Sequence, residues 1–83
     1  MIDRAEFMRR ALVALNGCSF KEGSHAADLV QRVRGHYQAE LAGRPRFTTP
    51  SQEAYFCKVL LQHRYEITDQ QLLEFAEHNA KGY

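Results

Sequence analysis

Apolar residues recur at helical spacing in four stretches of the chain, and each stretch opens on a helix start signal. Residues 25–41 place their apolar positions at i, i+3, i+4 and i+7, on one helix face, directly after Ser24 as an N-cap. Residues 4–15 repeat the pattern after Asp3, and Glu6 stands where a capping box would place it. The N-terminal half is therefore predicted to form two amphipathic helices.

The third stretch, from Thr49-Pro50 to about residue 63, is apolar on nearly every side. A helix with two apolar stripes is usually the buried centre of its domain. A fourth helix is expected over residues 69–80, with Thr68 as its N-cap and Gln71 at the third position. No stretch has the alternation of a strand, so the sequence predicts an all-α bundle of about four helices with the third helix central.

The length and composition fit one domain over residues 1–83. A chain of this size buries only about 60–65% of the surface that its unfolded form exposes, which leaves little room for a deep pocket. No segment approaches the roughly 20 apolar residues that span a bilayer, and the charged start lacks the apolar core of a signal peptide. We expect a cytoplasmic protein with reduced thiols and no membrane association.

The residues that could carry chemistry show no motif that draws them together. Cys57 lies on an apolar stripe of the third helix, where a buried, unreactive thiol is the common outcome, and Cys18 lies in a connection. The four histidines lack the spacing of a zinc site, and three of them have a carboxylate at helical neighbour distance: His25, His36 and His78. His63 extends an apolar stripe and is expected to be partly buried. We therefore expect no enzyme activity, no metal site and no cofactor.

A helix-turn-helix formed by the third and fourth helices is the first binding mode to consider. The outer face of the fourth helix would then meet DNA, and it carries Glu74 and Glu77. Two carboxylates facing phosphates repel them, and phosphate attraction supplies most non-specific affinity. The sequence therefore disfavours DNA binding through this helix.

The connection Arg44-Pro45-Arg46-Phe47 is the stronger candidate for a binding surface. It joins two guanidinium groups to an aromatic ring, and both residue types are enriched at binding hot spots. Arg32, on a flank of the preceding helix, extends this predicted surface. The alternative is that Phe47 tucks under the start of the third helix and that both arginines are merely solvated.

Two classes of function remain open at this point. The first is a small non-enzymatic regulator or inhibitor, of bacterial or phage type, that occupies the surface of a partner protein. The second is a nucleic-acid-binding module that uses the basic N-terminal half, with Arg44 and Arg46 as its candidate contacts. Residues 1–46 hold eight Lys/Arg against five Asp/Glu, a net charge of +3, whereas residues 47–83 hold three against five, a net charge of −2.

Overall fold

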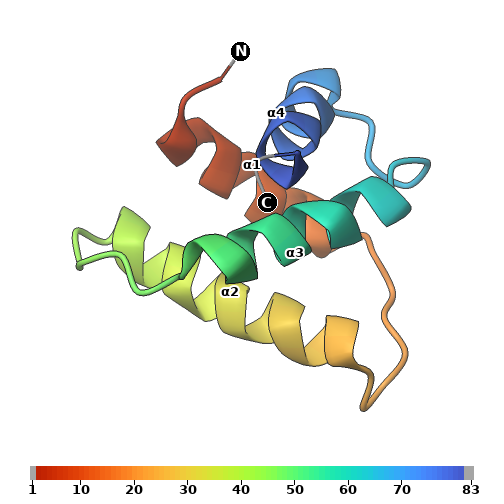
Figure 1. Cartoon of the computed structure of the whole chain (residues 1–83), viewed down its shortest axis with the longest axis horizontal. Helices are drawn as coiled ribbons and strands as arrows, with labels where there is room; N and C mark the ends of the chain where they lie inside the picture. Colours follow the sequence, from red (N-terminus) through yellow and green to blue (C-terminus); the bar gives the residue numbers. More distant parts are fainter. Residues whose placement is uncertain (1, 82–83) are drawn as a thin grey trace.

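Four α-helices make up the structure, a computed structural model that describes residues 2–81. They are α1 (Arg4–Leu15), α2 (His25–Leu41), α3 (Pro50–Gln62) and α4 (Gln70–Ala80), and no strand occurs among the described residues. Figure 1 shows α3 lying between α2 and α4, with α1 behind it. In the contacts between elements, α3 packs against α2 and α4, and α1 packs against the same two helices. The predicted all-α bundle with a central third helix is confirmed.

Three of the predicted N-caps hold the starts of their helices. The side chain of Asp3 accepts a hydrogen bond from the Glu6 backbone N–H. At the start of α2 the Ser24 side chain accepts from the Ala27 backbone N–H, and at the start of α3 the Thr49 side chain accepts from that of Gln52. Around Thr49 the capping box is complete, because the Gln52 side chain accepts from the Thr49 backbone N–H in return. These reciprocal bonds satisfy donors that the first helical turn would otherwise leave unpaired.

Two local predictions about the helix starts are wrong. The N-cap of α4 is Asp69 rather than Thr68, and its carboxylate accepts from the backbone N–H groups of Gln71 and Leu72. Asp is the stronger N-cap, and its anionic side chain also interacts favourably with the positive end of the helix dipole. No capping box closes at α1, because the Glu6 carboxylate turns to Arg9 and Arg10 instead.

The hydrophobic core draws on all four helices and is densest along α3. Leu60 and Cys57 of α3 are both 1% exposed, as the two apolar stripes predicted. Tyr37 of α2 meets Phe7 and Phe56 edge-on, and Phe7 also stacks on Phe75 of α4. These ring contacts tie α1, α2, α3 and α4 into one core, and the polar groups that reach solvent lie around its rim.

No helix among the described residues combines the length and the apolar character that a bilayer span needs.

Candidate functional site

The connection between α2 and α3 begins with a Schellman motif, which ends α2 and turns the chain. The Arg44 N–H donates to the Ala39 carbonyl oxygen and the Gly43 N–H to the Glu40 carbonyl oxygen, both at 3.0 Å. Gly43 takes the left-handed conformation that this motif requires, with φ at +92°. The backbone just before the predicted binding residues is therefore fixed by hydrogen bonds.

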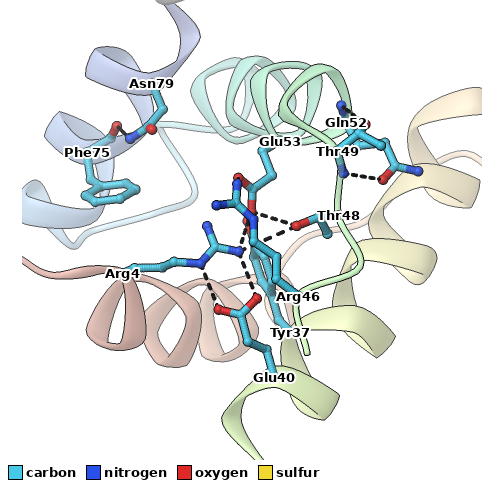
Figure 2. A network of polar contacts seen from close by, with 10 residues as sticks. All are labelled: Arg4, Tyr37, Glu40, Arg46, Thr48, Thr49, Gln52, Glu53, Phe75 and Asn79. Carbon is cyan, nitrogen blue, oxygen red and sulfur yellow. Dashed lines mark hydrogen bonds and ion pairs between the residues drawn. The ribbon is translucent and has the colours of Figure 1, made fainter. Parts of the chain in front are cut away.

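The far end of the same connection is held by the carboxylate of Glu53, in the first turn of α3 (Figure 2). Its Oε1 accepts hydrogen bonds from the Thr48 hydroxyl at 3.0 Å and from the Tyr37 hydroxyl at 3.4 Å. Its Oε2 accepts from the guanidinium of Arg46. The Glu53 side chain is only 13% exposed, so these bonds form in a partly dry environment, where hydrogen bonds to a charged group contribute most.

Arg4 brings α1 into the same polar cluster. Its guanidinium lies 2.6 Å from Glu53 Oε1, and it makes two further bonds, of 2.8 and 3.0 Å, with the two oxygens of Glu40. The hydrogen bond and charge of Arg4 lower the pKa of Glu40, and the two carboxylates raise the pKa of Arg4. Burial beside Glu53 raises the pKa of Tyr37. Arg4, Tyr37, Glu40, Arg46, Thr48 and Glu53 thus form one network, called the Glu53 network below.

The predicted surface residues divide into two groups in the structure. Arg46 is bound to Glu53, so its charge is neutralised within the fold. Phe47, between the two anchored residues, points outward and is 60% exposed, and its ring centroid lies 6.1 Å from that of His36. The alternative expectation is therefore wrong for Phe47, which does not tuck under α3, and for Arg46, which is paired. It holds for Arg44, which is exposed. The Glu53 network already secures the start of α3, and it leaves the aromatic ring outside.

Arg44 lies in the same connection as Phe47, and Arg32 lies on α2, the helix that carries His36. Arg44 is exposed at the start of the connection and forms no salt bridge with another described residue. Arg32 stands one helical turn before His36 on the same face of α2, and it pairs with Asp28 at 3.2 Å. The structure therefore leaves a surface made of the exposed Phe47 and Arg44 and the half-buried His36, extended by Arg32. It is called the Phe47 surface below.

The basic excess of the N-terminal half is largely compensated by ion pairs. Of its eight Lys/Arg residues, five form salt bridges within the described chain: Arg4, Arg9, Arg10, Arg32 and Arg46. The predicted pair of Arg10 with Glu6 is present at 2.9 Å. Compensated arginines offer less attraction to phosphate, because counterion release depends on free cationic charge.

The histidine and thiol expectations have mixed outcomes. Asp28, expected beside His25, is bound to Arg32, and Glu40, expected beside His36, is bound to Arg4. Glu74, expected beside His78, accepts a hydrogen bond from Gln70. Cys57 is buried as expected, and burial, with the nearby charge of Glu53, raises the pKa of its thiol to about 12. A thiol with so high a pKa holds almost no thiolate near neutral pH.

A second cluster of chemically capable side chains lies at the opposite end of α3. The fold brings Cys18, His63 and Glu66 together, with one ligand-type atom of each within 4.8 Å of the others. The sequence pattern did not indicate this cluster, since Cys18 stands far from the other two in the chain. The His63-x-x-Glu66 spacing was the one available signal, and it gave no hint of the cysteine.

Comparisons with protein families, with curated proteins and with solved structures found no match to this chain.

Proposed function

We propose that this protein is a small non-enzymatic regulator that binds a partner protein and acts by occupying the partner's surface. The observation that supports the proposal is the exposed Phe47 ring, held between two residues that the Glu53 network anchors. The ring therefore projects from a segment whose neighbouring residues are held in place on both sides.

The anchoring lowers the cost of binding. Ordering a loop and its side chains on association costs roughly 0.5–1.5 kcal/mol for each immobilised side chain. In this connection the Schellman motif and the bonds of Arg46 and Thr48 with Glu53 have already restricted the backbone. An aromatic side chain adds a large apolar area with few rotatable bonds, which is why aromatic residues are common anchors at interfaces.

The charge around Phe47 defines the kind of partner. Arg44 forms no salt bridge within residues 2–81, whereas Arg46 pairs with Glu53 and Arg32 pairs with the exposed Asp28. The matching surface is an apolar pocket for one aromatic ring, bordered by acidic side chains that face Arg44. A protein surface offers such a pocket, whereas a phosphate backbone would need the arginines that internal pairs already hold.

The test compares single variants in a capture experiment from lysate, with and without nuclease. Phe47→Ala removes the proposed anchor, and Tyr65→Ala is the matched control, because Tyr65 is 88% exposed on the α3–α4 connection. We expect Tyr65→Ala to keep the captured protein and Phe47→Ala to lose it. With the purified partner, the Phe47 loss should reach about 2 kcal/mol or more, roughly 30-fold in Kd.

Arg44→Ala is the second variant and should weaken binding while leaving Tm nearly unchanged, since exposed charges contribute within about 0.5 kcal/mol. Arg46→Ala is a poor choice for this purpose, because it removes a partner of Glu53 and disturbs the network. Unchanged affinity of a folded Phe47→Ala variant would overturn the proposed surface. Capture that disappears with nuclease and falls steeply with salt would instead support the nucleic-acid alternative.

A further inference from the structure

Three side chains with metal-ligating atoms meet where the α1–α2 connection passes the end of α3. Cys18 follows α1, His63 is the C-cap of α3, and Glu66 lies in the turn that follows. The Sγ of Cys18, a ring nitrogen of His63 and a carboxylate oxygen of Glu66 all lie within 4.8 Å of one another. His63 Nδ1 already contacts Glu66 Oε2 at 2.8 Å. This set is called the Cys18 cluster below.

We propose that the Cys18 cluster is a binding site for a borderline divalent transition metal ion, with Zn²⁺ as the best match. One sulfur, one imidazole nitrogen and one carboxylate oxygen form a typical mixed zinc ligand set. Tetrahedral zinc places such atoms roughly 3.3–3.6 Å apart, given Zn–ligand distances of about 2.0–2.3 Å. The upper limit of 4.8 Å is within about 1.5 Å of these separations, and the His63–Glu66 pair at 2.8 Å would open by about 0.5 Å.

The surroundings of the cluster suit a metal ion better than a nucleophilic thiol. The Cys18 thiol hydrogen-bonds to the Ala14 carbonyl at 3.4 Å, and burial together with the charge of Glu66 raises its pKa. Reactive thiols need the opposite, an electropositive setting that stabilises the thiolate. A bound cation would supply that positive charge, displace the thiol proton to solvent and take over the contact between His63 and Glu66.

The site is supported on one side and open on the other. Phe20 packs edge-on against the His63 ring, with centroids 4.8 Å apart, and limits how the ring can turn. Glu66 is 52% exposed and also lines an open groove of about 560 Å³ beside α1, so its carboxylate is accessible from solvent. Three protein ligands leave a fourth position for water, and the bound ion would tie the α1–α2 connection to the turn after α3.

The experiment is a titration of the reduced, metal-free full chain with Co²⁺, followed by absorption spectroscopy. We expect one ion per chain, a thiolate-to-cobalt charge-transfer band and displacement by Zn²⁺. Cys18→Ser should abolish the band, and Glu66→Gln should weaken binding at least tenfold without affecting the fold, because Glu66 is exposed. His78→Gln is the matched control and should bind as the wild type does.

Thermal unfolding gives a second measurement. Zn²⁺ in excess should raise the Tm of the wild type and of His78→Gln, and leave the Tm of Cys18→Ser unchanged. Co²⁺ spectra without a thiolate band would overturn the proposal. So would equal affinity in the wild type and Glu66→Gln, or a band that persists in Cys18→Ser and therefore comes from Cys57.

Discussion

A single carboxylate, that of Glu53, fixes the residues on either side of the proposed anchor. It accepts hydrogen bonds from Thr48, Tyr37 and Arg46 and forms an ion pair with Arg4 (Figure 2). These partners come from α1, α2 and the α2–α3 connection, so one side chain joins three parts of the chain. Breaking a largely buried pair by removing one member is costly, because the remaining charge keeps its desolvation penalty.

Glu53→Ala should therefore lower the free energy of unfolding by about 2–3 kcal/mol in urea denaturation. Glu53→Gln retains the shape of the side chain and should fall between this variant and the wild type. Glu74→Ala, on the exposed face of α4, is the matched control and should change stability by less than about 0.5 kcal/mol. If Glu53→Ala were as mild as Glu74→Ala, the network would contribute little to the fold.

At the residue scale, the sequence singled out the binding candidates but could not predict their surroundings. The Arg44–Phe47 connection stood out by residue type and by its length. That Arg46 is bound could not be inferred, because its partner Glu53 belongs to a network that includes Arg4, 49 residues before Glu53. The pattern also left open whether Phe47 is buried or exposed. The pair of Arg4 with Glu40 likewise followed from packing, whereas helix spacing alone predicted the pair of Arg10 with Glu6. The expected histidine pairs did not form.

At the scale of single helices, local signals were sufficient to predict nearly every helix boundary. The bounds predicted for the first two helices match α1 and α2, since caps and apolar periodicity act within a few residues. The error at α4 arose because Thr68 and Asp69 are adjacent cap-type residues and the pattern suits both. Which of the two caps α4 also depends on the ion pair of Arg10 with Asp69, a long-range contact that the local pattern does not contain.

This correction makes a discriminating prediction for the start of α4. Asp69→Ala should destabilise the protein by about 1 kcal/mol, because two backbone N–H groups lose their acceptor. Thr68→Ala should be nearly neutral, since Thr68 is exposed and does not cap the helix. Asp69→Asn keeps a capping oxygen but loses the ion pair with Arg10, so it separates the two contributions. Equal losses at positions 68 and 69 in urea denaturation would show that the cap is shared.

At the scale of the whole molecule, the sequence pattern could not predict which helices pack against each other. Amphipathic faces indicate that helices pack, but they do not specify that α1 contacts α2 and α4. The Cys18 cluster has the same origin, because only the packed fold brings the connection after α1 to the end of α3 (Figure 1). Long-range juxtapositions of this kind leave no spacing in the sequence.

The lowered pKa values of two carboxylates that bind arginines predict how the stability of the whole molecule changes in acid. Hydrogen bonds from arginines lower the pKa of Glu40 and of Glu6 in the folded state. A group whose folded pKa lies below its unfolded value, about 4.3 for Glu, contributes stability above the unfolded pKa. That contribution is lost as the pH falls through the folded pKa, because the unfolded chain then binds protons more readily.

We therefore expect the urea concentration at the midpoint of unfolding, the urea midpoint, to decrease as the pH falls from about 5 to about 3, and to decrease further at lower pH. Glu40 joins α2 to α1 through Arg4 and is mostly buried, so its share of this loss should be measurable. Glu40→Gln removes the titrating group while keeping a hydrogen-bond acceptor for Arg4. Its midpoint should be lower than that of the wild type at pH 7, and the difference should shrink as the pH approaches 3. A constant difference across this range would mean that the ion pair between α1 and α2 does not drive the acid response.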